Sequence, residues 1–182
     1  NGNQFFIGEK GIILYNKEQI ELNSWGYNMN KFMKVAIEEA YKGIKKCVGG
    51  LFGAVVVRNN KIVGKGHNCV LKNNDATCHA EMMAIRDACK NLKSFSLRGC
   101  DIYITAFPCI MCIGGMLWSN IRNIYYGCSL KENNDIGFRD QVFVKNLNLC
   151  IKKVNKPFIQ LDHKECRKLF DDYLKIKDRK IY

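Results

Sequence analysis

The sequence predicts an α/β fold, specifically a three-layer α/β/α sandwich with a central mixed sheet of five strands. Segments with apolar residues at helical spacing alternate with short apolar runs, which is typical of a sheet covered by helices on both faces. Two of these runs flank Asn59-Asn60, which indicates a hairpin and therefore an antiparallel pair of strands. A length of 182 residues fits one domain, to which we assign residues 29–182. Residues 1–28 lack a clear period and are assigned to an N-terminal extension.

The elements of this domain follow from local patterns. Gly49-Gly50 ends the first helix, and Pro108 suits the first turn of the third, where its missing N–H is not needed. The predicted order is helix 28–47, strand 52–57, strand 62–66, loop 68–77, helix 79–92, strand 101–107, helix 108–118, strand 124–127, polar loop 129–140, short helix 142–147, strand 158–161 and helix 164–177.

Composition narrows the class of protein. Lys and Arg outnumber Asp and Glu by 29 to 17, which gives a formal charge of +12. This charge permits a nucleic-acid partner, but the basic residues are scattered, so solvated surfaces are the simpler interpretation. No run of about twenty apolar residues is present, so no membrane span is expected. Several of the ten cysteines lie in apolar, periodic stretches where reduced thiols pack, which predicts a reducing, cytoplasmic location.

A split metal motif is the strongest functional signal. His79-Ala80-Glu81 starts the second predicted helix, and Pro108-Cys109-Ile110-Met111-Cys112 starts the third. His79, Cys109 and Cys112 supply three ligands for Zn²⁺, and a catalytic zinc site keeps its fourth position open for water. Glu81 is not a ligand in this interpretation, but it lies close enough to act as general acid and base. The combination is typical of zinc deaminases that act on nucleobases.

A structural zinc site is the alternative, and it needs a fourth ligand. Cys78 is nearest in sequence, but the adjacent side chains of Cys78 and His79 would both have to turn onto one metal at a helix start. Cys100 and Cys128 have no spacing relation to the other ligands. A closed site would also leave Glu81 without a purpose, so we favour catalytic zinc.

Beyond the zinc motif, the sequence resembles the bacterial-type guanine deaminases of the cytidine deaminase-like superfamily over residues 30–182. The likeness rests on Gly66-His67-Asn68, on Gly137-Phe138-Arg139-Asp140 and on the C-terminal Tyr182. The resemblance implies a homodimer that exchanges C-terminal segments. The residues that it implies for binding of the substrate base are Asn68, Ala80 through its backbone, Asp140 and Tyr182.

Two residues depart from the pattern of this family. Phe107 replaces the usual Glu before the Pro of the zinc motif, and Arg139 replaces the first Asp of a G-F-D-D sequence. Neither change removes a zinc ligand. Both are expected to reshape the edge of the pocket or to change the substrate.

The resemblance implies a zinc-dependent hydrolase of purine metabolism that converts guanine, a small-molecule substrate, to xanthine and ammonia. Two alternatives stay open. A tRNA adenosine deaminase would keep the chemistry, would have nucleic acid as its partner, and suits the positive charge. A zinc protein without activity, acting as a partner subunit or RNA-binding module, belongs to another class, and the presence of Glu81 argues against it.

Overall fold

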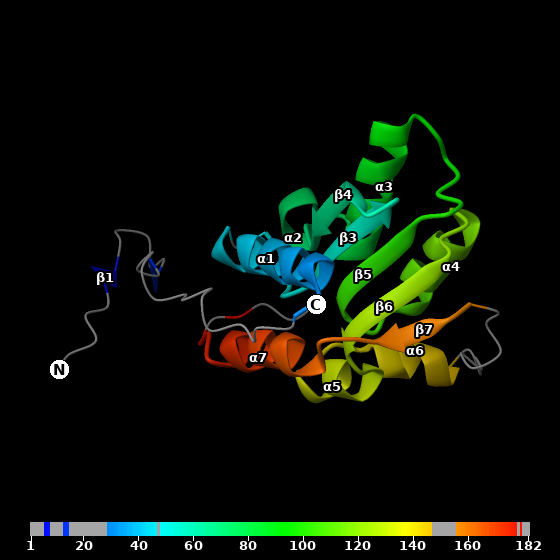
Figure 1. Ribbon diagram of the computed structural model, residues 1–182. Coiled ribbons are helices and arrows are strands. Elements are labelled where there is room, and N and C mark those ends of the chain that lie inside the picture. Colours follow the sequence, from blue (N-terminus) through cyan, green and yellow to red (C-terminus); the bar gives the residue numbers. More distant parts are fainter. Residues whose placement is uncertain are drawn as a thin grey trace.

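The computed structural model describes residues 6–7, 13–14, 29–46, 48–146, 156–177 and 179. Its centre is a mixed sheet of five strands (Figure 1), as the sequence predicted. β3 pairs antiparallel with β4 and β5, whereas β6 lies parallel to both β5 and β7. From one edge to the other, the strands are β4 (Lys61–His67), β3 (Gly53–Arg58), β5 (Asp101–Ala106), β6 (Asn123–Cys128) and β7 (Phe158–Gln160).

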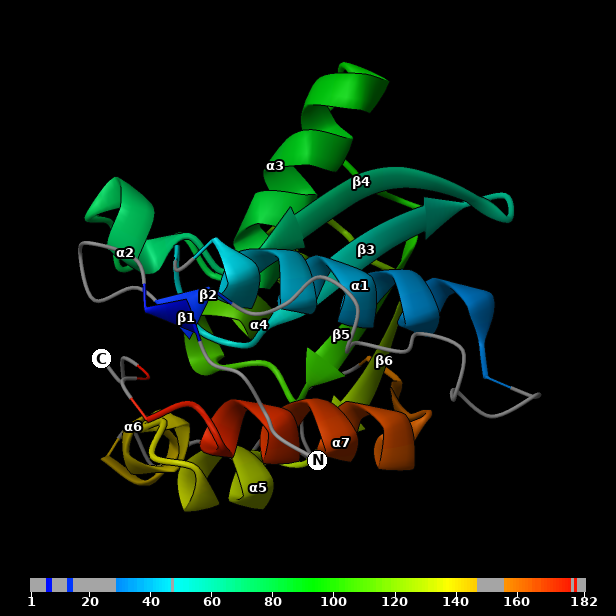
Figure 2. The ribbon, with the colours of Figure 1, turned by 90° about the vertical axis from the view of Figure 1, so that its left-hand side faces the viewer.

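Helices cover both faces of this sheet. α1 (Lys31–Lys45) and α7 (His163–Leu174) lie side by side on one face (Figure 2), and α3 (Ala80–Leu92) and α4 (Ile110–Trp118) cover the other. Consecutive residues of β3 therefore face different layers: Val55 belongs to the core under α1 and α7, and Val56 to the core under α3 and α4. Because both faces are buried, the strand needs a continuous apolar run. The predicted three-layer sandwich is confirmed.

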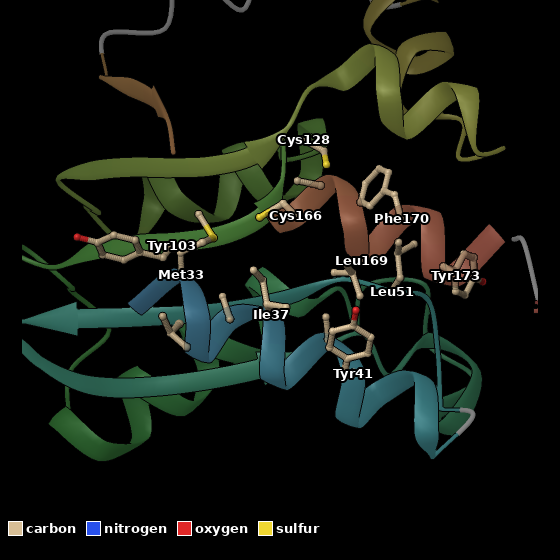
Figure 3. Close-up of a cluster of buried hydrophobic side chains, with 14 of the residues drawn as sticks. Met33, Ile37, Tyr41, Leu51, Tyr103, Cys128, Cys166, Leu169, Phe170 and Tyr173 are labelled. Atoms are coloured by element: carbon tan, nitrogen blue, oxygen red, sulfur yellow. The ribbon is translucent and has the colours of Figure 1, made fainter. Parts of the chain in front are cut away.

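Large apolar side chains fill the core between the sheet and the pair α1 and α7 (Figure 3). Met33 of α1 and Leu169 and Phe170 of α7 are each 0% exposed. At the edge of this core, the Tyr41 hydroxyl donates a hydrogen bond of 2.7 Å to Oδ2 of Asp172. The last helix is thus held against the first by apolar burial and by a direct hydrogen bond.

Two local backbone features shape the β3–β4 hairpin. Asn59 and Asn60 both adopt the left-handed conformation, with φ of 49° and 60°, as a tight hairpin turn between twisted strands requires. On β4, a Cβ atom at Gly66 would lie 2.5 Å from the carbonyl oxygen of Ala80. Only glycine therefore lets the first turn of α3, where the metal motif begins, approach the sheet this closely.

The predicted polar loop over residues 129–140 was wrong in part, because α5 (Leu130–Asp135) forms within it. The Ser129 hydroxyl accepts a hydrogen bond from the N–H of Glu132, and the Glu132 carboxylate accepts one from the N–H of Ser129. This capping box satisfies donors at the helix start, so a short polar segment becomes helical without an apolar period.

The predicted loop over residues 68–77 also contains a helix, α2 (Val70–Asn73). It spans a single turn, which is too short to give a helical period in the sequence. By contrast, α6 (Asp140–Asn146) agrees with the short helix predicted over residues 142–147.

Of the predicted N-terminal extension, the structure describes two short antiparallel strands, β1 (Phe6–Ile7) and β2 (Ile13–Leu14). The rest of residues 1–28 lies outside the described residues, so the domain boundary stays a prediction. Among the described helices, none has the length and apolar character needed to cross a membrane. The eight cysteines within the described ranges all carry free thiols.

Candidate active site

Both halves of the metal motif lie at the beginnings of helices. His79 directly precedes α3 and Cys109 directly precedes α4, and both residues have an extended backbone, with ψ of 156° and 169°. Cys112 follows within the first turn of α4 and is 0% exposed. Since α3 and α4 contact each other on one face of the sheet, their first turns bring the three side chains together. The positive ends of the helix dipoles favour thiolates at this position.

The ligand atoms of His79, Cys109 and Cys112 form one cluster. Nδ1 of His79 lies 3.5 Å from Sγ of Cys109 and 3.7 Å from Sγ of Cys112, and all ligand atoms lie within 4.8 Å of one another. In a tetrahedral zinc site, with Zn–N and Zn–S distances of about 2.1 and 2.3 Å, neighbouring N and S ligands are roughly 3.6 Å apart. The two measured separations therefore fit a single metal ion.

Cys78 does not join this cluster. Its Sγ accepts a hydrogen bond of 3.3 Å from Nδ2 of Asn73 and donates one of 3.2 Å to Oδ2 of Asp75. The side chain packs instead with Cys69 in a separate small core. Within the described ranges, the metal-ligand group contains His79 and two cysteines and no fourth member, as an open site requires.

The two thiols of the cluster differ in their ease of ionisation. Hydrogen bonding from the Cys112 thiol, and also from His79, lowers the pKa of Cys109 to about 4, although burial opposes this shift. The same pairing with Cys109 raises the pKa of Cys112, and burial adds to the increase. The cluster thus stabilises a thiolate at Cys109, and thiolate is the form of cysteine that binds metal.

Glu81 lies beside the cluster on the first turn of α3 and is 7% exposed. Burial raises the pKa of its carboxyl to about 7, and the negative charge of Cys109 contributes. A divalent cation on the three ligands would lower this pKa again, because a positive charge favours the carboxylate. A carboxyl poised between these influences is suited to both accepting and donating a proton near neutral pH.

The metal-ligand group opens into a cavity of about 570 Å³. Polar groups line it at a few points, and apolar side chains form most of its wall, as in many small-molecule sites. The polar lining residues are Asn68, His79, Glu81, Asn133, Arg139 and Asp140. The aromatic lining residues are Phe52, Phe107, Phe138 and Phe143.

Asn68 reaches the cavity directly after β4 and is 1% exposed. Its backbone N–H donates a hydrogen bond of 3.1 Å to the carbonyl of Phe52, and its Oδ1 accepts one of 3.1 Å from the N–H of Val70. Gly49 lies against this side chain, and a Cβ atom at position 49 would collide with Oδ1 of Asn68. The predicted base-binding amide is therefore tightly positioned.

Asp140, at the first residue of α6, also lines the cavity. Its Oδ2 accepts a hydrogen bond of 3.3 Å from Nδ2 of Asn133, and burial raises the pKa of the carboxyl. Ala80 is 0% exposed and lies between two cavity-lining residues, His79 and Glu81. Tyr182, the remaining predicted binding residue, lies outside the described residues.

Asn133 is a cavity residue that the sequence analysis missed, because the segment was interpreted as a polar loop. It lies on α5 and is 1% exposed. The available signal was the spacing of Ser129 and Glu132, which matches a capping box and predicts a helix start. A predicted helix would have given the position of Asn133 along the helix, but it would not have predicted which residues Asn133 contacts.

Both departures from the family pattern lie at the cavity. Phe107 stacks on Phe158, with ring centroids 5.3 Å apart and an angle of 24°, so an aromatic wall stands where the family has a carboxylate. Arg139 is exposed at the cavity, with its guanidinium 5.9 Å from the centroid of the Phe143 ring. The rim therefore carries a positive charge beside an aromatic side chain.

The sequence profile of the cytidine and deoxycytidylate deaminase zinc-binding region matches residues 27–128. The chain therefore belongs to this family of zinc-binding deaminases. Among its relatives, it is 33% identical over 155 residues to the guanine deaminase of Bacillus subtilis, which covers 85% of this chain and 99% of that protein. It is also 34% identical to a tRNA-specific adenosine deaminase of Buchnera aphidicola, over 80% of this chain and 93% of that protein.

Solved structures give the same two kinds of neighbour. The crystal structure of the Bacillus subtilis guanine deaminase superposes with a TM-score of 0.63 and covers 85% of this chain and 99% of its own. A structure from a study of A-to-I editing by tRNA:A34 deaminases superposes with a TM-score of 0.64 at 27% identity, over 76% of this chain and 97% of its own. The fold and the deaminase class agree, while the substrate differs between the relatives.

Proposed function

We propose that the protein catalyses the hydrolytic deamination of guanine to xanthine and ammonia, with Zn²⁺ as its cofactor. The observation that carries the proposal is one cavity lined by His79 and Cys109 of the His/Cys/Cys metal-ligand group, by the buried carboxyl of Glu81 and by a second carboxyl at Asp140. The likeness to the Bacillus subtilis guanine deaminase spans nearly all of that relative and supports the choice of guanine.

His79, Cys109 and Cys112 would hold the zinc ion, as the N–S separations of 3.5 and 3.7 Å allow. When bound, Zn²⁺ supplies a Lewis acid that lowers the pKa of water to near neutral pH. The two cysteines provide thiolates and His79 a neutral ring nitrogen. In the metal-free cluster, the hydrogen bond to Cys109 raises the pKa of His79 to about 9 in spite of burial, and it also raises the pKa of Cys112, so metal binding would release protons from both residues.

Glu81 would carry the protons of the reaction. It takes a proton from the attacking water and delivers it to N3 of the guanine ring, while the water oxygen forms a bond to C2. It then takes the second proton of the former water from the hydroxyl on C2 and gives it to the departing amino group, as the C2–N bond breaks and the C2 carbonyl forms. Guanine and water thus become xanthine and ammonia, and Glu81 returns to its starting state.

The remaining cavity residues would orient the purine. The Asn68 amide and the Asp140 carboxylate offer hydrogen-bonding groups, and Phe52, Phe107 and Phe138 offer apolar surfaces for the rings. By resemblance to the family, Tyr182 and the backbone at Ala80 would complete the contacts. The same resemblance suggests a homodimer in which Tyr182 reaches the site of the partner, which sedimentation of the full chain would test.

Turnover of guanine tests the proposal directly. Zinc-loaded protein incubated with guanine is expected to form xanthine and ammonia, followed by ultraviolet absorbance and by an ammonia assay. Formation of neither product by protein that contains zinc would contradict the proposed function.

A second candidate is a tRNA adenosine deaminase, and the exposed Arg139 at the cavity favours it. An enzyme of this class must accept a flipped base that is still joined to its backbone, so a positive charge at the rim would meet a phosphate. The formal charge of +12 and the tRNA deaminases among the relatives agree with this candidate. Inosine formation in tRNA, without xanthine formation from guanine, would favour it.

A further inference from the structure

Asn133 connects the two parts of the site. Its Nδ2 donates a hydrogen bond of 3.0 Å to the carbonyl of Phe107, two residues before Cys109, and one of 3.3 Å to Oδ2 of Asp140. Both partners are acceptors, so the orientation of the amide is fixed with its nitrogen toward them. Its Oδ1 must therefore point elsewhere.

That oxygen is buried and accepts no hydrogen bond from any described residue. Asn133 is 1% exposed, and it lines the same cavity as Glu81 and Asp140. A buried acceptor without a donor destabilises the fold, and such groups mark places where a ligand or water completes the hydrogen bonding. Here the ligand must supply an N–H or O–H.

We propose that Asn133 is a specificity-determining residue whose Oδ1 accepts a hydrogen bond from a ring N–H of the substrate. Oδ1 of Asn133 and the Asp140 carboxylate form a pair of neighbouring acceptors, which fits a purine edge with N–H donors. A purine that is alkylated at the nitrogen bonded to Oδ1 would bind less well. The inference rests on the proposed function, since it assigns a role to a residue in the same cavity. It defines the substrate as a purine that keeps this ring N–H.

Binding of purines that cannot react tests the proposal. Hypoxanthine lacks an exocyclic amino group but keeps two ring N–H groups. Methylation at N1 removes the first, and methylation at either N7 or N9 removes the imidazole N–H. Dissociation constants of hypoxanthine and its three methyl derivatives would be measured by calorimetry for the zinc-loaded parent and for Asn133→Leu. Leucine is similar in volume and has no acceptor.

The decisive quantity is the ratio of the dissociation constant of each methylated probe to that of hypoxanthine. In the parent, either the N1-methyl derivative or both the N7- and N9-methyl derivatives are expected to bind roughly tenfold more weakly than hypoxanthine, as loss of one hydrogen bond predicts. In Asn133→Leu this ratio is expected to fall to about one, because the acceptor is already absent. If Asn133 served only to position Asp140 or the Cys109 loop, all four probes would weaken by the same factor, and the unchanged ratios would overturn the proposal.

Two controls separate this inference from the proposed function. Asn134→Leu changes an exposed residue of the same type on the same helix and is expected to leave all four constants unchanged. Elemental analysis should find equal zinc in every variant. If the parent converts guanine but the ratios do not change, only the inference fails; if the parent neither converts guanine nor binds hypoxanthine, both fail.

Discussion

Glu81 combines deep burial with a position in the first turn of α3, two residues after the metal ligand His79. Its carboxyl contacts the cluster closely enough that its charge affects Cys112, and its pKa is raised to about 7 by burial and by Cys109. The side chains whose charges shift this pKa are Cys109, His79 and Asp140, and all three line the cavity. The proposed role of Glu81 is therefore open to a direct test.

Replacement of Glu81 by Gln is expected to lower kcat for deamination by about 10²- to 10⁴-fold, because the amide cannot move a proton. Zinc content and thermal unfolding should stay close to those of the parent, since Gln has the same shape. Glu38→Gln, on α1, is the matched control and should keep full activity. A Glu81→Gln variant that turns over guanine as fast as the parent would remove the acid/base role.

Gly49 is required by its contact with Asn68. A Cβ at position 49 would collide with Oδ1 of Asn68 and lie 2.5 Å from its carbonyl oxygen, so Gly49→Ala must displace the amide. We expect KM for guanine to rise by roughly tenfold, about the value of one hydrogen bond, with a smaller effect on kcat. Gly114→Ala is the control, because nothing lies within 4 Å of its added Cβ. Equal KM values for parent and Gly49→Ala would show that Asn68 does not bind the base.

Between elements, the end of β4 is joined to α1 by the pair of His67 and Glu39. Nδ1 of His67 lies 3.2 Å from Oε2 of Glu39, and Nζ of Lys42 lies 2.7 Å from Oε1 of the same carboxylate. The hydrogen bond with His67, assisted by Lys42, lowers the pKa of Glu39 to about 2 in spite of burial. His67 is thus a polar strand end that supports the neighbouring Asn68, rather than a cavity residue.

This pair predicts a dependence of stability on pH. Because the carboxyl of Glu39 binds its proton less readily in the folded state, its stabilisation is present above the ordinary pKa of 4.5 and is lost as pH falls toward about 2. Urea unfolding of the parent should show a free energy that decreases over this range. Glu39→Gln should be less stable near pH 6 and show a shallower decrease; an equally steep decrease would assign the effect to other groups.

The elements that the sequence predicted are those whose own composition determines them. β3 is a continuous apolar run because helices cover both of its faces. The metal ligands at the starts of α3 and α4 are recognisable from their residue types and their short spacing in the sequence. By contrast, α5 is mostly polar, and its buried side chain is Asn133, so periodicity could not reveal it. Asn133 belongs to the site because it contacts Phe107 and Asp140, and no local sequence pattern predicts these contacts.

The residues that line the cavity were also harder to predict, because they come together only through contacts between distant parts of the chain. Phe52 and Phe138 pack edge to face, with ring centroids 4.7 Å apart at 73°, although 86 positions separate them in the chain (138 − 52). Phe52 looks like an ordinary core residue in the sequence, and Phe138 stands out only through the resemblance at residues 137–140. Only the folded sheet and α6 bring them to the metal-ligand group.

At the scale of the whole molecule, a metal ion would join α3 to α4 and so link the hairpin side of the sheet to its parallel side. Removal of zinc with a chelator is therefore expected to abolish deamination and to lower Tm, and added Zn²⁺ should restore both. Stabilisation by a ligand present at 100 times its Kd is about 2.7 kcal/mol. Differential scanning calorimetry would measure the shift.

Cysteine variants make this experiment specific. Cys112→Ser should have a low Tm that the chelator no longer changes, because its metal ligand is missing. Cys78→Ser should respond to the chelator like the parent, since the Cys78 thiol bonds with Asn73 and Asp75 rather than with the cluster. A chelator response that depends on Cys78 would contradict the three-ligand site.

The family profile ends at Cys128, immediately before the segment that carries Asn133, Phe138, Arg139 and Asp140. The metal-ligand group and these four cavity-lining residues thus lie in consecutive, non-overlapping stretches of the sequence. On the proposed function, a change confined to the second stretch would alter which purine is preferred, and the metal ligands would be inherited unchanged.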